Sequence, residues 1–191
     1  ILNYKNDVQE YYIVSAGGEN KTVIFNIIGS PVLIDIIHML KRGGTKNAYF
    51  ISFAGTKEDY IIGDYFIPTR VRCLDGITVY YESGIKYIEV EEDARQRVTG
   101  LFSQEKYHYG TSASVPSFFH ENLEVQIALD SEKGISAIEM EASTALYFSR
   151  KQSISCSPLL IISDNGHTSI PDGFNRREEA FYNATIKILE R

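Results

Sequence analysis

The chain has 191 residues, a formal net charge of −6 at pH 7, 43% hydrophobic residues and 12% aromatic residues. This composition is typical of one globular domain and excludes an intrinsically disordered chain, because the apolar content offsets the entropy of ordering. The acidic balance disfavours a general nucleic-acid binder, which needs a basic surface.

The two cysteines, Cys73 and Cys156, are too few for a disulfide framework and favour a reducing compartment. No signal peptide is visible, and no apolar stretch reaches the roughly 20 residues of a membrane-spanning helix. We therefore expect a cytoplasmic protein without membrane or nucleic-acid partners.

Strand-like and helix-like segments alternate along the chain. Runs rich in β-branched and aromatic residues predict strands at 22–28, 47–53, 63–67, 77–81, 107–112 and 158–162. Apolar residues at helical spacing predict helices from Ser30 to about Gly43 and at 90–102, 137–150 and 174–189. This alternation predicts an α/β fold around a largely parallel sheet.

Polar or small residues follow several of the predicted strands, where α/β folds bind their ligands. These positions are Gly29 and Ser30, the run 52–55, the run 110–114, and Ser163 with Asp164. We therefore expect the functional site at this end of the sheet.

The first candidate pair is Glu139 and Glu141, which flank Met140 near a helix start. Residues two apart do not share a helix face, so one carboxylate can enter a pocket while the other stays solvated. The alternative is a plain acidic first turn, which the helix dipole favours.

The second candidate is Asp164, directly after the apolar run 158–162. An acid at the end of a buried strand is partly desolvated, which raises its pKa and suits a general acid. The alternative is that Asp164 caps a helix or a turn. Arg176 or Arg177 can partner this acid and tune its proton affinity, or can simply face solvent.

A third candidate is the helix start at Gly29, Ser30 and Pro31, where free backbone N–H groups can bind an anion or a hydroxyl. Ser30 fits the N-cap and Pro31 the first helical position, so the alternative is an ordinary capped helix. The four histidines show no metal-ligand spacing, and we expect no metal.

Together these segments resemble the nucleoside phosphorylase-I family, which includes purine nucleoside phosphorylases, uridine phosphorylases and methylthioadenosine nucleosidases. The strongest similarity is the block 137–143 with its Glu-Met-Glu triplet, followed by 161–165 at a similar interval to the family's. Weaker support comes from Gly63 with Asp64, 67–69, Asp75 with Gly76, and 110–112 ahead of Phe118. The resemblance runs from about Tyr11 to the C-terminus.

The resemblance implies a three-layer single domain over 1–191, with a mixed, mostly parallel twisted sheet flanked by helices. It implies that Asp164 protonates the leaving base, that Arg177 supports this acid, and that Glu141 accepts hydrogen bonds from the ribose hydroxyls. Met140 is expected beneath the sugar. Further substrate-binding residues are expected among this set: Gly29, Ser52, Ser112, Phe118 and Glu139.

The implied activity is cleavage of the N-glycosidic bond of a nucleoside by a pentosyltransferase of purine salvage. The expected route is phosphorolysis to the free base and ribose 1-phosphate, with inorganic phosphate as co-substrate and no other cofactor. A purine is favoured because the run 111–116 lacks the Gln-x-x-Arg pair with which uridine phosphorylases bind pyrimidines. By analogy we expect a homo-oligomer, either a dimer or a trimer of dimers.

The chain also departs from the family around the anion. The usual phosphate-binding Arg is missing from the strand 49–55, where Phe53 takes the place of a small hydroxyl residue and Ser52 is the possible substitute. The early phosphate loop with its Arg also has no counterpart. Each lost charge-assisted bond removes about 1.5–3 kcal/mol. Arg70 or Arg72 can supply a cation instead, or both can be surface residues.

Two alternatives to phosphorolysis therefore stay open. Water can replace phosphate, as in the nucleosidases, although their water-activating Glu comes from the N-terminal part that this chain does not match. The chain can also be a catalytically weakened homologue that binds nucleosides without cleaving them.

Overall fold

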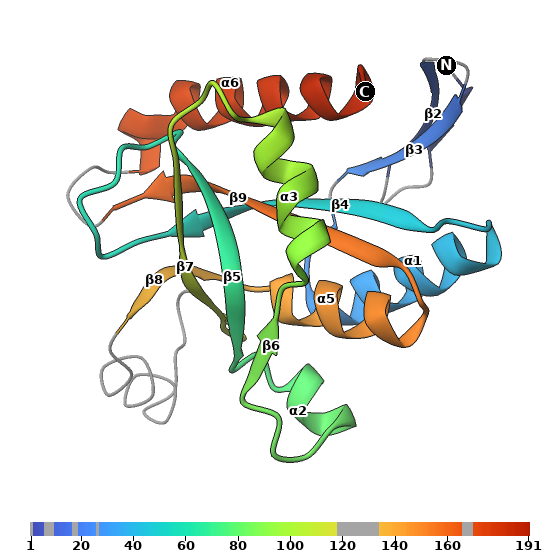
Figure 1. Cartoon of the computed structure of the whole chain (residues 1–191), viewed down its shortest axis with the longest axis horizontal. Coiled ribbons are helices and arrows are strands. Elements are labelled where there is room, and N and C mark those ends of the chain that lie inside the picture. The colour runs from blue at the N-terminus through green and yellow to red at the C-terminus, as the bar shows by residue number, and fades with distance from the viewer. Residues whose placement is uncertain (1, 6–9, 17–18, 26, 118–133, 166–169) are drawn as a thin grey trace.

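The structure is a computed structural model that describes residues 2–5, 10–16, 19–25, 27–117, 134–165 and 170–191. Within these residues, six strands form the main sheet (Figure 1). They are β4 (Asn47–Gly55), β5 (Tyr65–Cys73), β6 (Tyr87–Glu89), β7 (Tyr107–Ser114), β8 (Ile135–Glu139) and β9 (Ser155–Asp164).

The strand order in this sheet is β6-β5-β7-β8-β4-β9, and β5 also pairs with β9. The long pairings of β4 with β9 and of β7 with β5 and β8 are parallel. The shorter pairings of β4 with β8, and of β5 with β6 and β9, are antiparallel. The predicted mixed sheet is therefore confirmed.

Helices cover both faces of the sheet, which gives the three predicted layers (Figure 1). One face is covered by α1 (Ser30–Arg42) and α5 (Ala142–Lys151), which bury Ile37 and Leu146 against Val71 of β5. The other face is covered by α3 (Glu92–Leu101) and α6 (Ile170–Leu189), which bury Val98 and Ala184 against β9. None of the helices in the described ranges is long and apolar enough to cross a membrane.

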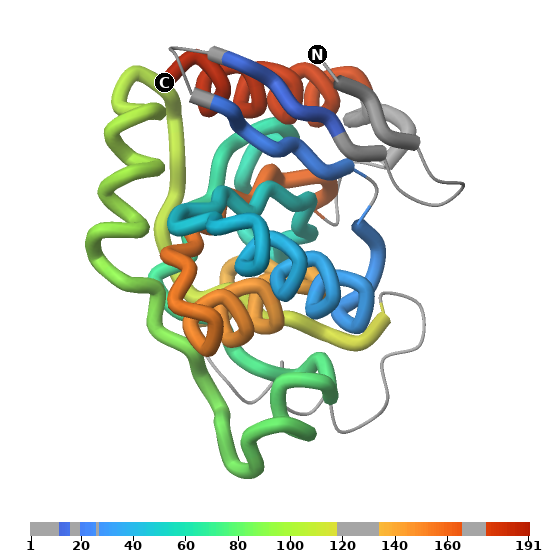
Figure 2. Tube along the Cα trace, turned by 90° about the vertical axis from the view of Figure 1, so that its right-hand side faces the viewer, coloured from blue at the N-terminus to red at the C-terminus, as the bar shows by residue number. Residues whose placement is uncertain are grey.

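The N-terminal part forms a separate antiparallel sheet of β1 (Leu2–Lys5), β2 (Glu10–Ala16) and β3 (Glu19–Phe25). It lies beside the C-terminal end of α6 (Figure 2). There the Lys21 amino group donates to the Leu189 carbonyl oxygen at 2.7 Å. The sequence predicted a buried strand at 22–28. The strand exists, but Thr22 is exposed and Val23 only half-buried, because β-branched runs suit exposed hairpins as well as buried strands.

Two further predictions of secondary structure are wrong. The run 77–81 forms the helix α2 (Ile77–Tyr81) instead of a strand, because Gly76 adopts a left-handed φ of 78° and Asp75 accepts the Thr78 N–H at 3.1 Å. The predicted helix 137–150 is split into β8 and α5. Buried and half-buried residues alternate in β8, which makes it a strand beside β7.

Candidate active site

The Glu-Met-Glu triplet connects β8 to α5 and holds Glu139 in the interior. Glu139 has no exposed surface, and its Oε2 accepts the N–H groups of Glu141 and Ala142, both at 2.6 Å. The Ser114 hydroxyl donates to its other oxygen. Burial raises the pKa of Glu139 to about 7 against the effect of these three bonds. Its predicted contact with a substrate stays a prediction, while in the structure its carboxylate binds backbone N–H groups at the start of α5.

Glu141 faces the start of α1, from which it is separated by more than one hundred residues of sequence. Its Oε1 accepts the Gly29 N–H at 3.0 Å, and the Ser30 hydroxyl donates to the Met140 carbonyl oxygen at 3.2 Å. Gly29 has a φ of 89°, which only glycine adopts without strain, and it replaces the predicted Ser30 as the N-cap of α1. Burial raises the pKa of Glu141, and the Gly29 N–H partly offsets this. One predicted donor of an anion site thus binds the protein's own carboxylate.

Asp164 ends β9 and is half-buried. The Ser163 hydroxyl donates to its Oδ2 at 3.0 Å, and its backbone carbonyl oxygen accepts the Thr56 N–H at 3.0 Å. Its Oδ1 lies where a side chain on Gly55 would be, since a Cβ there would approach to 2.8 Å. The absence of a side chain at Gly55 therefore makes room for this carboxylate.

The strands that carry the two carboxylates both pair with the end of β4. Gly55, the last residue of β4, pairs with Asp164 of β9 on one side and with Ile138 of β8 on the other. Neighbouring strands lie about 5 Å apart, so the backbones of Ile138 and Asp164 are roughly 10 Å from each other. Glu141 follows three residues after Ile138. That Glu141 and Asp164 face one shared site stays a prediction.

The positions of three other predicted site residues do not test the roles expected of them. Ser52 lies inside β4, where its hydroxyl is 3.4 Å from the Phe53 carbonyl oxygen. Ser112 is fully buried, and its hydroxyl has no hydrogen-bond partner among the described residues. Phe118 lies outside the described residues. The roles expected of these three residues stay predictions.

Arg177 lies on α6, with its guanidinium carbon 5.3 Å from the centre of the Phe53 ring and its Nε 3.7 Å from a Glu178 carboxylate oxygen. Phe53 also packs against Phe181 of α6, with ring centres 5.5 Å apart. Phe53 therefore faces α6, and the alternation of a strand points the adjacent Ser52 to the opposite face of the sheet. Support of Asp164 by Arg177 stays a prediction.

Arg70 and Arg72, the alternative cations, both lie against Tyr87 of β6, with guanidinium carbons 4.5 and 5.4 Å from the ring centre. The Arg70 Nε also donates to the Thr111 hydroxyl at 3.0 Å. These contacts hold both guanidinium groups at the β5–β6 pair. They favour a structural role for the two residues.

Sequence reasoning missed a polar cluster beside Asp164. His108 Nε2 lies 2.8 Å from a carboxylate oxygen of Asp64, and the Tyr60 ring stacks on the imidazole with ring centres 3.8 Å apart. The Asn165 amide donates to the Tyr60 carbonyl oxygen at 3.0 Å, which ties this cluster to the residue after Asp164. Their positions could have indicated this cluster, because Asp64 and His108 stand near the starts of two predicted strands.

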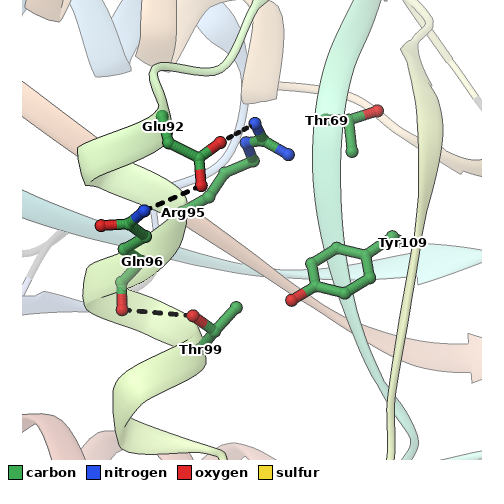
Figure 3. Close-up of a pocket in the computed structure, with 6 residues that line it drawn as sticks. All are labelled: Thr69, Glu92, Arg95, Gln96, Thr99 and Tyr109. Carbon is green, nitrogen blue, oxygen red and sulfur yellow. Dashed lines mark hydrogen bonds and ion pairs between the residues drawn. The ribbon is translucent and has the colours of Figure 1, made fainter.

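A hollow of about 310 Å³ lies elsewhere, between α3 and the strands β5 and β7 (Figure 3). Most polar groups around it bond to the protein. Glu92 binds Arg95 and Gln96, the Thr99 hydroxyl donates to the Gln96 carbonyl oxygen, and the Thr69 hydroxyl donates to a backbone oxygen of β7. With these groups already paired, the hollow presents few free donors or acceptors to a ligand, and it contains none of the predicted site residues.

Fold and site together define an α/β protein with a mixed sheet, in which Asp164 ends β9 and Glu141 closely follows β8, the two strands that pair with Gly55 at the end of β4. Residues 3–190 match the model of the phosphorylase superfamily, and the chain belongs to this superfamily. The family resemblance carried by the Glu-Met-Glu block is thereby confirmed.

Individual relatives agree with this family. The chain is 26% identical over 163 residues to a guanosine phosphorylase of Halorubrum lacusprofundi, which covers 82% of this chain and 67% of the relative. A uridine phosphorylase of Vibrio fischeri has the same fold, with a TM-score of 0.85 at 19% identity over 98% of this chain and 79% of that one. A Campylobacter jejuni 5′-methylthioadenosine/S-adenosyl homocysteine nucleosidase is similar with a TM-score of 0.79 at 18% identity. The match covers 99% of this chain and 87% of that one. The predicted fold is confirmed.

Proposed function

We propose that this protein cleaves the N-glycosidic bond of a purine nucleoside by phosphorolysis, giving the free base and ribose 1-phosphate. The observation that carries this proposal is the pairing of Gly55, at the end of β4, with Asp164 on one side and with Ile138, three residues before Glu141, on the other. The curated relative, a guanosine phosphorylase, supports the same reaction class and a purine base.

Glu141 is suited to bind the sugar. Its Oε1 is fixed by the Gly29 N–H, and its Oε2 has no hydrogen-bond partner among the described residues. A carboxylate held at one oxygen can accept the ribose hydroxyls with the other at little cost in side-chain entropy. These bonds orient the sugar and strengthen as positive charge builds on its ring.

Asp164 is suited to protonate the base. As the bond from C1′ to the base nitrogen breaks, its electron pair passes to the base, and a proton from the Asp164 carboxyl neutralises the developing negative charge on a ring nitrogen. An oxygen of inorganic phosphate forms the new bond to C1′. Arg177, on the helix α6 that packs against Phe53 of β4, is proposed to support Asp164.

Hydrolysis is the second candidate function. It is favoured by β4 itself, whose run 49–55 offers no cationic side chain, and by the Gly29 N–H, which already binds Glu141 instead of an external anion. Water then forms the bond to C1′ and the products are the free base and ribose. A nucleoside-binding homologue without turnover is the third candidate, and it rests on the same missing cations.

The test is an assay of the purified protein with inosine, guanosine, adenosine and methylthioadenosine, each with and without phosphate. Release of the base that depends on phosphate, with ribose 1-phosphate as co-product, is the expected result. Equal release without phosphate would favour hydrolysis, whereas a rise in the melting temperature without turnover would favour the binding homologue. No base release and no thermal shift with any nucleoside would contradict all three.

The chain is proposed to act as one domain over 1–191 in a cytoplasmic homo-oligomer, either a dimer or a trimer of dimers. The support is analogy with the family alone. No cofactor is proposed beyond inorganic phosphate as co-substrate. Sedimentation equilibrium of the purified protein gives the number of subunits directly.

A further inference from the structure

Glu139 and Ser114 bind the first N–H groups of α5 as a pair. Glu139 takes the N–H groups of Glu141 and Ala142, and the Ser114 oxygen takes that of Ser143 at 2.8 Å while its hydroxyl donates to Glu139. Three consecutive N–H groups at the start of the helix are therefore bound by side chains from the ends of β7 and β8. All the atoms involved are buried.

This arrangement differs from an ordinary helix start. The side chain of an N-cap residue usually folds back onto the N–H groups two or three positions later. The N-cap of α5 is Glu141, which makes no such bond. Ser114 already binds the Ser143 N–H, two positions after Glu141, and Glu139 holds the N–H groups of Glu141 and Ala142. The Glu141 side chain reaches Gly29 on α1 instead. Burying a carboxylate completely costs desolvation free energy, and a serine at the N-cap would bind the helix start with a smaller cost of this kind.

We propose that Glu139, oriented by Ser114, is a positioning residue that sets the direction of the Glu141 carboxylate and does not itself contact the sugar. This inference rests on the proposed function, in which Glu141 binds the ribose hydroxyls. It replaces the expectation that Glu139 belongs to the substrate-binding residues.

The geometry tolerates either protonation state of Glu139. An ionised carboxylate accepts the Ser114 hydroxyl, whereas a protonated one donates to the Ser114 oxygen and still accepts both N–H groups with its other oxygen. The titratable groups around it are Glu141, Asp75, which is reached through Ser143, and the buried Cys73. Glu139→Gln therefore keeps the bonding pattern, while Glu139→Asp withdraws the carboxylate by one methylene.

The experiment compares kcat/KM for a ribonucleoside with kcat/KM for its 2′,3′-dideoxy analogue, because only the former offers hydroxyls to Glu141. We expect Glu141→Ala to lower this ratio by about 100-fold and Glu139→Asp by about 10-fold. Glu139→Gln should stay within about 3-fold of the wild type. In the Glu141→Ala background, Glu139→Asp should change the ratio no further.

The matched control is Asp75→Asn, a second buried carboxylate, which binds the side chains of Thr78, Ser143 and Thr144. This variant should lower the melting temperature but leave the ratio unchanged. An effect of Asp75→Asn on the ratio as large as that of Glu139→Asp would overturn the inference, because it would make the effect a general consequence of instability.

Two other results would also overturn it. One is a wild-type ratio in Glu139→Asp, and the other is an equal loss in Glu139→Gln, which would mean that Glu139 acts through its charge on the substrate. If Glu139→Asp does not fold, Ser114→Ala removes the orienting hydroxyl and should lower the ratio by about 3-fold. An unchanged ratio in that variant would count against the proposal.

If the wild type cleaves no nucleoside, the proposed function fails and the geometry is tested by itself. A crystal structure of Glu139→Asp should then show the distance from Glu141 Oε1 to the Gly29 nitrogen beyond 3.5 Å. Retention of the 3.0 Å bond would overturn the positioning role independently of any activity. If Glu139→Asp gives no crystals, the distance from Glu141 Oε1 to the Gly29 nitrogen is measured in Ser114→Ala instead. A distance beyond 3.5 Å would support the positioning role, and a retained 3.0 Å bond would overturn it.

Discussion

The proposed sugar end of the candidate site, at Glu141, and its proposed base end, at Asp164, are built in different ways. At the sugar end, Glu141 is 9% exposed and is fixed by a hydrogen bond from Gly29, while Glu139 and Ser114 fix the backbone beneath it. At the base end, Asp164 is half-buried, and its position depends on the missing side chain of Gly55.

This difference matches the two proposed tasks. A group that orients a sugar works best when its direction is fixed before the substrate arrives, because less entropy is then lost on binding. A general acid must regain a proton in every cycle, so partial access to solvent is useful. Four changes would break or sharpen the comparison.

The largest effect is expected from Asp164→Asn. An amide cannot donate a proton as an acid does, so kcat should fall by about 10²–10⁴-fold with little change in the melting temperature. Asp35→Asn is the matched control, because Asp35 is an exposed carboxylate on α1. Activity near the wild-type level in Asp164→Asn would show that Asp164 is not the general acid.

A smaller effect is expected from the titration of Glu139 on the stability of the protein. Burial raises the pKa of Glu139 from 4.5 to about 7. Between these pH values the folded protein holds a proton that the unfolded chain has released. The free energy of unfolding should therefore fall as the pH rises through this window, by on the order of 3 kcal/mol, and level off above it.

Glu139→Gln should remove this part of the pH dependence, and Glu190→Gln, at an exposed position, should not. Urea unfolding at pH 5 and pH 8 measures both. Equal slopes with pH in the wild type and in Glu139→Gln would show that Glu139 is not the titrating group.

Gly55→Ala should lower kcat by about tenfold while KM changes little, because the added Cβ would come within 2.8 Å of Asp164 Oδ1 and displace the acid. Gly100→Ala is the control, since a Cβ on this helical glycine meets nothing within 4 Å. That substitution should stabilise the protein by about 0.5–1 kcal/mol. If Gly55→Ala raises KM and spares kcat, the acid is not held by this close approach.

The smallest effect is expected from His108→Ala, at the polar cluster beside the base end. Burial acts to raise the pKa of Asp64, but hydrogen bonds from His108, Lys106 and the Ile61 N–H together lower it below 3.8. This contribution to stability is present above pH 3.8 and is lost as the pH falls below it.

Loss of the His108 bond should therefore cost about 1 kcal/mol near pH 6 and weaken the acid-side pH dependence. His38→Ala, at an exposed position on α1, should have no such effect. Chemical unfolding between pH 3 and pH 6 provides the measurement. The same loss in both variants would argue against a specific role for the cluster.

Most elements of the fold could be predicted from local patterns. The apolar run in β9 and the capped helix α1 are strong local signals, and both lie where they were expected within a few residues. The helix α2 could not be recognised, because its β-branched and aromatic residues favour a strand and only the cap by Asp75 decides for the helix. The residues of β8 were assigned to a helix, because their pairing with β7 is invisible to local patterns.

The sequence by itself determined the α/β class, the family and three acidic candidates, since these depend on periodicity and on residues adjacent in the chain. Only the tertiary structure decided which acid caps a helix and which stays available. Glu139 and Glu141 are two residues apart and chemically identical, yet one binds backbone N–H groups of α5 and the other an N–H of α1. Sequence spacing cannot separate them, because their difference lies in contacts with segments far away in the chain.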